Sequence, residues 1–167
     1  METCSEKIGP KISIITVSYN SERYIEDAIK SVLMQTYDNI EYIVIDGKSD
    51  DGTVDIIKKY QDKIDYMISE PDSGIYEAFN KGVRASSGDI IYFLNSDDYL
   101  ISEDSIAAAA KVFMDNRELK IVYGNVLIVN EKFKSSYIFG REMGLEDFRK
   151  GYMPPHQGTF VKRELFD

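Results

Sequence analysis

One segment constrains the fold more than any other: residues 90–99, IIYFLNSDDY, in which an apolar run leads directly into Asn95, Ser96, Asp97 and Asp98. A short apolar run of this kind is typical of a strand that is buried on both faces of a sheet. Two neighbouring carboxylates at its end repel each other, and a hard divalent cation with oxygen ligands would relieve the repulsion. In open α/β sheets, ligands bind beyond the carboxyl ends of strands, so the position suits a metal-bound phosphate ligand. The alternative is an Asx turn that simply ends the strand.

Strand-like and helix-like segments alternate along the chain. Apolar and β-branched runs predict strands at 12–17, 40–45, 66–69, 90–94, 121–123 and 126–129, and residues 132–139 are expected to pair with the last of these as a hairpin or edge ribbon. Helical spacing and capping residues predict helices near 25–33, 51–60, 75–83, 104–114 and 145–149. This order predicts an α/β protein with a mostly parallel sheet flanked by helices, and a small antiparallel ribbon toward the C-terminus.

The composition is that of an ordinary soluble protein with one domain. The 167 residues are 43% hydrophobic and 29% charged, and we expect a disordered leader at 1–10 ahead of a single domain at 11–167. The net charge of −9 argues against nucleic acid as a partner, because binding it requires clustered lysine and arginine. The single cysteine, Cys4, cannot form an internal disulfide, and no apolar stretch reaches the roughly 18 residues of a transmembrane segment. A cytoplasmic location is therefore expected.

The first predicted strand is not followed by a glycine-rich phosphate loop. The patterns G-x-G-x-x-G and G-x-x-x-x-G-K-[ST] are both absent from the sequence. A dinucleotide-binding Rossmann enzyme and a P-loop NTPase are therefore poor interpretations. Any phosphate binding must depend on a metal instead.

Three polar clusters follow three of the predicted strands, at residues 16–20, 46–51 and 95–98. A doubly wound sheet gathers the carboxyl ends of its parallel strands on one edge, so we expect Thr16, Asp46 and Asp97 to line a single cleft. Thr16 and Tyr19 could meet a base or ribose through a hydroxyl and a ring face, and Asp46 could accept from a ribose hydroxyl or a base N–H. Ordinary packing of Tyr19 and a turn cap at Asp46 are the alternatives.

Four segments, TVSYN (16–20), IEYIVIDGKSDDGT (40–53), SEPDSGIYEAFNKG (69–82) and SGDIIYFLNSDD (87–98), occur in an order and spacing that resemble glycosyltransferase family 2. The resemblance covers about residues 11–167. It implies the GT-A fold and an inverting, metal-dependent transfer from a nucleotide-sugar donor to an acceptor hydroxyl. It further implies Mn²⁺ or Mg²⁺, a UDP- or GDP-linked donor and a saccharide or lipid-linked saccharide acceptor. By analogy, the setting is cell-surface polysaccharide assembly, in the cytoplasm or at the inner face of the membrane.

The resemblance also assigns roles to individual residues. Thr16, Tyr19 and Asp46 would lie against the nucleoside, Asp72 and Lys81 near the base and diphosphate, Asn95 at the ribose, and Asp97 on the metal with Asp98 beside it. A PHQ-like segment places His156 or Gln157 near the diphosphate or the acceptor; the alternative for this lone histidine is a hydrogen-bonded structural role.

The sequence departs from the family pattern at two positions. Asn95 stands at the first D-x-D position, which removes a charge, and Gly47 follows Asp46 where a second acidic residue is common, which removes one nucleobase contact. The general base that an inverting transferase needs is expected beyond Asp167. We then expect the chain to be a fragment that is impaired in sugar transfer, with a nucleotide-sugar-binding half at 11–124 and the start of an acceptor half at 125–167.

Two other functions stay open. A non-catalytic nucleotide-sugar-binding module would keep the fold but lack the base. A nucleotidyltransferase has a similar sheet and also needs metal, but it usually carries a glycine-rich, basic loop after the first strand, which TVSYNSERY does not provide.

Overall fold

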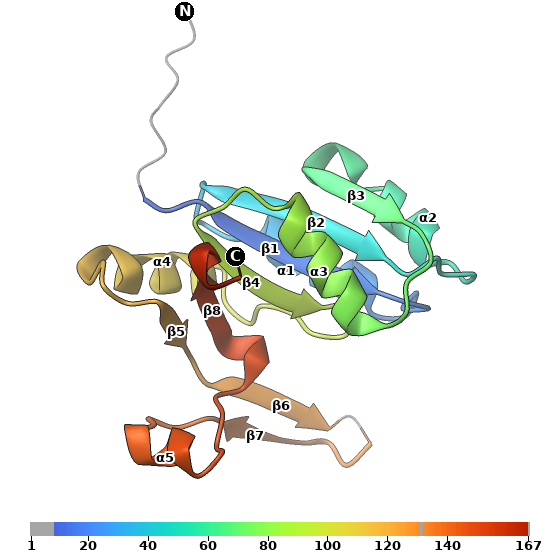
Figure 1. The fold of residues 1–167 in the computed structure, drawn as a ribbon. Coiled ribbons are helices and arrows are strands. Elements are labelled where there is room, and N and C mark those ends of the chain that lie inside the picture. Colours follow the sequence, from blue (N-terminus) through green and yellow to red (C-terminus); the bar gives the residue numbers. More distant parts are fainter. Residues whose placement is uncertain (1–8, 131, 167) are drawn as a thin grey trace, which may run out of the picture.

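A computed structural model describes residues 9–130 and 132–166, which form a six-stranded sheet with flanking helices and a separate two-stranded ribbon (Figure 1). The strands are β1 (Ile12–Ser18), β2 (Ile40–Asp46), β3 (Tyr66–Ser69), β4 (Ile90–Asn95), β5 (Ile121–Tyr123), β6 (Val126–Asn130), β7 (Ser135–Phe139) and β8 (Thr159–Lys162). The α-helices are α1 (Ile25–Leu33), α2 (Thr53–Lys58), α3 (Ile75–Ala85), α4 (Ser105–Asp115) and α5 (Leu145–Arg149). Short 3-10 helices are η1 (Gln61–Lys63), η2 (His156–Gly158) and η3 (Arg163–Leu165). Most of the predicted leader, with Cys4, lies outside the described residues.

The six strands follow the order β3-β2-β1-β4-β8-β5. Strands β1 to β4 are parallel, and β8 runs antiparallel to both β4 and β5. In this register Ser18 lies opposite Asp46, and Val17 lies opposite Asn95. The prediction that the first, second and fourth strands are parallel neighbours ending at one edge is therefore confirmed.

Strand β8 was not predicted from the sequence. It is four residues long, TFVK, and its place in the sheet depends on pairing with β4 and β5, which lie far away in the sequence. Its buried side chain, Phe160, stacks on Tyr92 of β4 with ring centroids 4.3 Å apart. A strand this short gives no periodicity to read, so long-range packing rather than local pattern determines it.

The two faces of the sheet bury separate apolar clusters. Alternate residues of β1 project to opposite faces, so Ile12 and Ile14 pack with α1, α2 and α4, while Ile15 and Val17 pack with α3. The sheet therefore separates a larger core on one side from a smaller one on the other, and Figure 1 shows α3 in front of the sheet and α1 behind it.

Helix α3 lies unusually close to β1. A Cβ atom placed on Gly82 would lie 2.3 Å from Cγ2 of Ile15. Only glycine allows this approach, which fixes the height of α3 over the sheet and so the position of the loop that precedes the helix.

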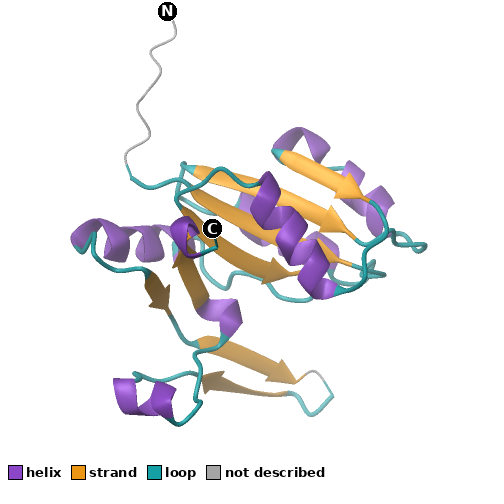
Figure 2. Cartoon of the chain, viewed as in Figure 1, coloured by secondary structure: helices purple, strands orange, loops and turns teal. Residues whose placement is uncertain are grey.

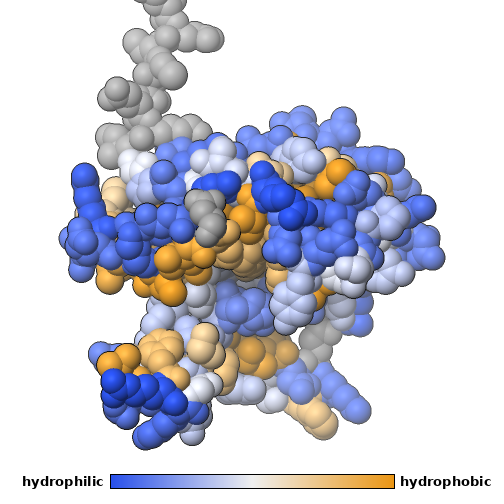
Figure 3. Space-filling view, in the orientation of Figure 1, coloured by the Kyte–Doolittle hydropathy of each residue, from blue (hydrophilic) through white to orange (hydrophobic). Residues whose placement is uncertain are grey.

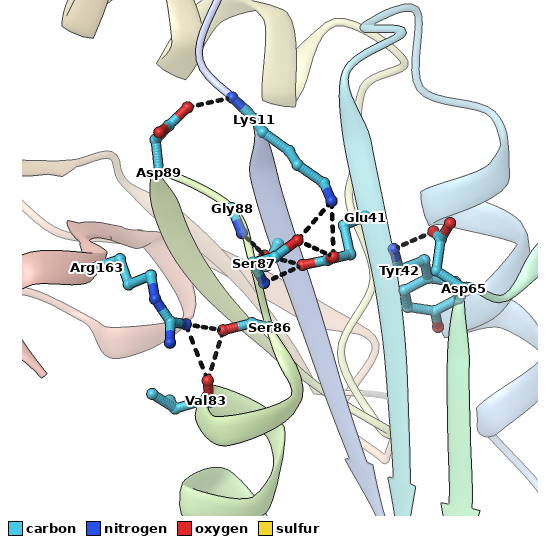
Figure 4. Close-up of polar contacts among 11 residues, drawn as sticks. Lys11, Glu41, Tyr42, Asp65, Val83, Ser86, Ser87, Gly88, Asp89 and Arg163 are labelled. Carbon is cyan, nitrogen blue, oxygen red and sulfur yellow. Dashed lines mark hydrogen bonds and ion pairs between the residues drawn. The ribbon is translucent and has the colours of Figure 1, made fainter.

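The amino edge of the sheet carries a polar network around Glu41 (Figure 4). The residue Glu41 is 8% exposed, and its carboxylate accepts hydrogen bonds from Lys11 Nζ at 2.7 Å and from Ser13 Oγ at 2.5 Å. It also accepts from the Ser87 backbone N–H at 2.7 Å and Oγ at 2.6 Å. The network joins β1 and β2 to the segment that leads from α3 into β4.

The predicted antiparallel ribbon is present as β6 and β7, which pair from Val126–Phe139 to Asn130–Ser135 and lie apart from the large sheet (Figure 2). Its side chains are mostly exposed, including Ile138 at 70%. Within the described residues, every helix is too short or too polar to cross a membrane.

Candidate functional site

A cleft of about 910 Å³ opens at the edge of the sheet where β1 and β4 end. We call it the edge cleft. Its walls come from the loops after β1, β2 and β4 and from the start of α3: Val17, Ser18, Tyr19, Asn20, Ser21, Tyr24, Gly47, Lys48, Pro71, Asp72, Gly74, Ile75, Ala78, Asn95, Ser96 and Asp97. All four segments that resemble the family in the sequence therefore contribute residues to this one cleft.

The end of β4 is held in place by contacts on both sides. The Asp98 N–H donates to the Asn95 carbonyl at 3.1 Å, which closes a turn. The Ser96 N–H donates to the Val17 carbonyl at 3.2 Å, and the Ser96 and Ser21 hydroxyls are 2.8 Å apart. The alternative of a turn that ends the strand is therefore correct as local structure, and the same turn presents Asp97 to the cleft.

Asn95 has one amide atom bonded and one without a partner. Its Nδ2 donates to Asp98 Oδ2 at 3.2 Å and lies 3.3 Å from His156 Nε2. Its Oδ1 is buried, and no donor among the described residues reaches it. Buried polar atoms are nearly always paired, so a lone oxygen at this position indicates a site for a cation or a donor group of a ligand.

The carboxylates of Asp97 and Asp98 also indicate a site for a cation. Burial, and then the negative charge of Asp97, raise the pKa of Asp98 above its usual value. Asp97 itself is exposed at the cleft. Two adjacent carboxylates and an unpaired amide oxygen are the hard ligands that Mg²⁺ and Mn²⁺ prefer.

The residues present fit a cation only together with a ligand. Nowhere in residues 9–130 and 132–166 do three or more His, Cys, Asp or Glu side chains form a group that could hold a metal. Asp97 and Asp98 would therefore supply part of an octahedral shell, and the other ligands would have to be solvent or phosphate oxygens. Their assignment as metal ligands stays a prediction.

Thr16 and Asp46 lie at the predicted edge but under the cleft rather than in its wall. Both are fully buried. Thr16 Oγ1 lies 3.2 Å from the Tyr42 hydroxyl, and Asp46 accepts from the hydroxyls of Ser18 at 3.0 Å and Ser69 at 2.6 Å. The expectation that both line the cleft is wrong, because strand alternation turns these side chains toward the core. Any direct contact with a nucleoside stays a prediction.

Asp46 instead organises the loop that follows β2. Its Oδ2 accepts from the Ser49 N–H at 3.0 Å and its Oδ1 from the Ser49 hydroxyl at 2.5 Å. This matches the turn-cap alternative. The loop that it holds contributes Gly47 and Lys48 to the cleft.

Tyr19 and Asp72 both line the cleft, and their predicted contacts with a nucleotide stay predictions. The Tyr19 ring is 66% exposed, so it offers a free aromatic face. A Cβ atom on Gly47 would lie only 2.8 Å from Asp72 Oδ2. Gly47 stands where an acidic residue is common in the family pattern. The space beside it is filled by the Asp72 carboxylate, which comes from a different loop.

Lys81 does not reach the cleft. Its ammonium group contacts Glu70 at 2.9 Å and Glu77 at 3.5 Å, and donates to the Pro71 carbonyl at 2.9 Å. These contacts hold the loop that carries Asp72 against α3. Lys81 instead borders a separate pocket beside β3 and the end of α3, and its predicted contact with a diphosphate stays a prediction.

The sequence analysis missed Lys48. Among the described residues, it is the only lysine or arginine in the wall of the edge cleft. It has a φ of 62°, and Asn20, in the loop after β1, has a φ of 49°. Asn20 Oδ1 accepts from the Asp50 N–H at 3.0 Å, which ties the two loops together. Non-glycine residues held at positive φ are concentrated at functional sites. A lysine inside the turn after a buried strand was the available signal.

His156 and Gln157 lie in η2, on the other side of β4. His156 is exposed and contacts Asn95, while the Gln157 carbonyl accepts from the Tyr92 hydroxyl at 2.6 Å. Gln157 faces a second cavity of about 490 Å³, which Asp97 and Asp98 also border. The segment is therefore brought to the site, whereas contact with a diphosphate or acceptor stays a prediction.

Comparisons with known proteins agree with this geometry. The family model described as Glycosyl transferase family 2 matches residues 13–166. An uncharacterized glycosyltransferase of Mycobacterium tuberculosis is 33% identical over 162 residues, which are 94% of this chain and 60% of that protein. The chain thus spans less than two thirds of that relative's length.

Solved structures show the same architecture. The structure of S. aureus TarS in complex with UDP-GlcNAc matches with a TM-score of 0.69 and 25% identity, over 93% of this chain and 46% of that one. The mannosyltransferase PcManGT from Pyrobaculum calidifontis, in complex with GDP-Man and Mn²⁺, matches with a TM-score of 0.71 and 20% identity, over 95% and 46%. The second likeness shows the fold alone. Together they confirm the predicted fold class.

Proposed function

The chain belongs to glycosyltransferase family 2, and from this premise we propose that the edge cleft binds a nucleotide-sugar donor whose sugar is transferred, with inversion and with the help of a divalent metal, to an acceptor hydroxyl. The observation that carries the proposal is the end of β4, where Asp97, Asp98 and the unpaired Asn95 Oδ1 meet at the edge of a parallel sheet. Ligands of α/β sheets bind at this edge.

The walls of the cleft suit a nucleoside diphosphate. The exposed ring of Tyr19 offers a stacking face for a base, and Asp72, which fills the space beside Gly47, offers an acceptor for a base N–H. Asp72 would then supply the nucleobase contact that the glycine at position 47 removes. Lys48 provides the positive charge in the wall that could meet a phosphate.

The metal would be Mn²⁺ or Mg²⁺, held by Asp97 with Asp98 beside it. When bound, such an ion neutralises charge that builds up on the departing diphosphate. Asn95, tied to Asp98 and His156, would direct its free oxygen toward the ligand. The TarS structure holds UDP-GlcNAc and the PcManGT structure holds GDP-Man with Mn²⁺, and we propose a UDP- or GDP-linked donor here.

The acceptor side lies toward η2 and the ribbon. His156 and Gln157 are the residues of this chain that we place closest to the acceptor or diphosphate, and a saccharide or lipid-linked saccharide is the proposed acceptor. Asp147 is not a convincing base, because its carboxylate contacts Arg141 at 2.7 Å and accepts from the Gly144 N–H at 2.9 Å. Polysaccharide assembly at the inner face of the membrane is the setting that we propose.

A panel of UDP- and GDP-sugars, incubated with the chain and Mn²⁺ or Mg²⁺, tests the proposal. We expect release of UDP or GDP from one class of donor, abolished by EDTA and by Asp97→Ala. Absence of both nucleotide binding and nucleotide release with every donor would contradict the proposal. Release that continues in EDTA would contradict the role given to the metal.

A further inference from the structure

The second cavity, introduced above beside Gln157, is distinct from the edge cleft, and we call it the apolar cavity. It lies between β4, the loop after it, β6 and the segment from η2 to β8. Its wall consists of Tyr92, Leu94, Asp97, Asp98, Tyr99, Leu100, Ile101, Ser105, Gly124, Asn125, Val126, Leu127, Ile128, Val129, Gln157, Gly158 and Phe160. Its volume of about 490 Å³ is within the roughly 300–1,000 Å³ of small-molecule sites.

The apolar cavity and the edge cleft share a wall at Asp97. Tyr92 and Leu94 belong to the core on the α1 and α4 side of the sheet, whereas the edge cleft is bounded by α3 residues such as Ala78. The two spaces therefore lie on either side of the end of β4, with the Asp97–Asp98 turn between them. A molecule in the apolar cavity would have one end at this turn.

The chemistry of the apolar cavity differs from that of the edge cleft. Its floor is made by the buried side chains of Tyr92, Leu94 and Phe160, and its rim includes Ile101, 70% exposed, and Val129, 53% exposed. The space-filling view shows apolar surface on the main body and on the ribbon below it (Figure 3). Exposed apolar side chains that line a concave space are typical of a binding groove.

Charge narrows the choice of occupant. Of the described residues, no lysine, arginine or histidine contributes to this wall, whose charged groups are the carboxylates of Asp97 and Asp98. The wall offers a phosphate no cationic side chain, and the metal proposed at Asp97 and Asp98 is already bound to the donor diphosphate in the edge cleft, so a second diphosphate, such as a lipid diphosphate head group, does not suit this space. A neutral molecule with a hydroxyl at the Asp97 end and an apolar remainder does suit it.

We propose that the apolar cavity is the acceptor subsite for an apolar aglycone, an alkyl or aryl group that carries the acceptor sugar or hydroxyl. The inference rests on the proposed function, because the shared wall at Asp97 is what connects this cavity to a transfer site. It narrows the acceptor from any saccharide to one that bears an uncharged apolar group next to the reacting end.

Binding of simple glycosides tests the inference directly. The probes are methyl, hexyl and phenyl β-D-glucoside, titrated into the chain in the presence of Mn²⁺ and UDP, with binding followed by ligand-observed NMR. We expect the hexyl and phenyl glucosides to bind about tenfold more tightly than methyl glucoside, or better, because each buries apolar surface that the methyl group lacks.

Two matched variants show whether the apolar cavity is responsible. Ile101→Asn makes the rim polar without adding charge near Asp97, and Ile138→Asn makes the same change at an equally exposed isoleucine of β7 outside the cavity wall; both side chains are 70% exposed. Surface substitutions of this kind leave the fold intact. Ile101→Asn should remove most of the preference for the hexyl and phenyl probes, and Ile138→Asn should retain it.

Equal affinity for the three glucosides, or a preference that survives Ile101→Asn, overturns the inference. UDP affinity, measured in the same samples, reports separately on the proposed function. If UDP binds and the aglycone preference is absent, the donor site stands and the acceptor subsite does not. If the preference is present but UDP does not bind, the proposed function fails, and the assignment of this cavity to an acceptor fails with it.

Discussion

Glu41→Gln is the substitution whose effect on stability can be worked out most fully. Burial by itself raises the pKa of Glu41, but hydrogen bonds from Lys11, Ser13 and Ser87 outweigh it and lower the pKa from 4.5 to about 2. Glutamine keeps the size of the side chain, but it replaces one carboxylate oxygen with an NH₂ group. That NH₂ group cannot accept a hydrogen bond from the donors that surround Glu41. The Ser87 N–H cannot rotate away, so the amide oxygen should face it and the NH₂ group should face Lys11.

The size of the effect follows from the pKa. A difference of about 2.5 pH units, at about 1.4 kcal/mol for each unit, corresponds to roughly 3 kcal/mol of folding free energy. The side chain is only 11% exposed, so solvent screens little of this energy. Since domains of this kind have a total stability of about 5–15 kcal/mol, the loss should be easy to measure.

Urea unfolding of the wild type and Glu41→Gln at several pH values provides the assay. Because the folded-state pKa is depressed, the contribution of Glu41 is fully present above pH 4.5 and is lost as the pH falls through about 2. The wild type should therefore be more stable than the variant by about 3 kcal/mol at pH 7. The difference should shrink steadily below pH 4.5.

Glu118→Gln serves as the control, because Glu118 is an exposed glutamate outside this network. It should change the unfolding free energy by less than about 0.5 kcal/mol. A Glu41→Gln effect below about 1 kcal/mol at pH 7, or one that stays constant from pH 7 to pH 3, would refute the reasoning.

Two further substitutions test the packing of α3 and the crowding of carboxylates. Gly82→Ala should destabilise the protein by about 1–3 kcal/mol in urea unfolding, because its Cβ would collide with Ile15, and an unchanged midpoint would show that α3 can shift freely. Asp98→Asn should raise the melting temperature of the metal-free protein at pH 7 but not at pH 3. The raised pKa of Asp98 means that its ionised form costs stability as the pH rises above 3.8, and a variant that melts lower at pH 7 would contradict this.

Much of the fold follows from local patterns in the sequence. The short apolar runs of β1, β2 and β4 are strong signals, and their parallel arrangement follows from the helices between them. Strand β8 was not predictable in this way, because four residues between two distant partners carry no periodicity. Only tertiary pairing makes TFVK a strand.

The site was predictable in location more than in detail. The end of β4 and the acidic turn are where the sequence placed them, and Tyr19 and Asp72 line the edge cleft. Thr16 and Asp46 were misplaced because their side chains face the core. The sequence shows that a residue is near a strand end, but the direction of its side chain depends on strand alternation and on neighbouring hydroxyls.

For Lys81 and Lys48, too, the sequence did not indicate where the side chain lies relative to the edge cleft. Lys81 lies in one of the four segments that resemble the family, but its ammonium group pairs with Glu70 and Glu77 and is not in the cleft wall. Lys48 is in the cleft wall because of a backbone turn with positive φ, which residue type alone does not indicate. Helix and loop geometry decided which lysine faces the cleft.

Calorimetric titration of the chain with UDP and GDP, with and without Mn²⁺, tests the central claim most directly. The claim is that the Asn95–Asp98 turn and a divalent metal together hold a nucleoside diphosphate. We predict binding that EDTA weakens and Asp97→Ala removes, while the variant keeps the wild-type circular dichroism spectrum. Equal nucleotide affinity with and without metal, or full affinity in Asp97→Ala, would contradict the account.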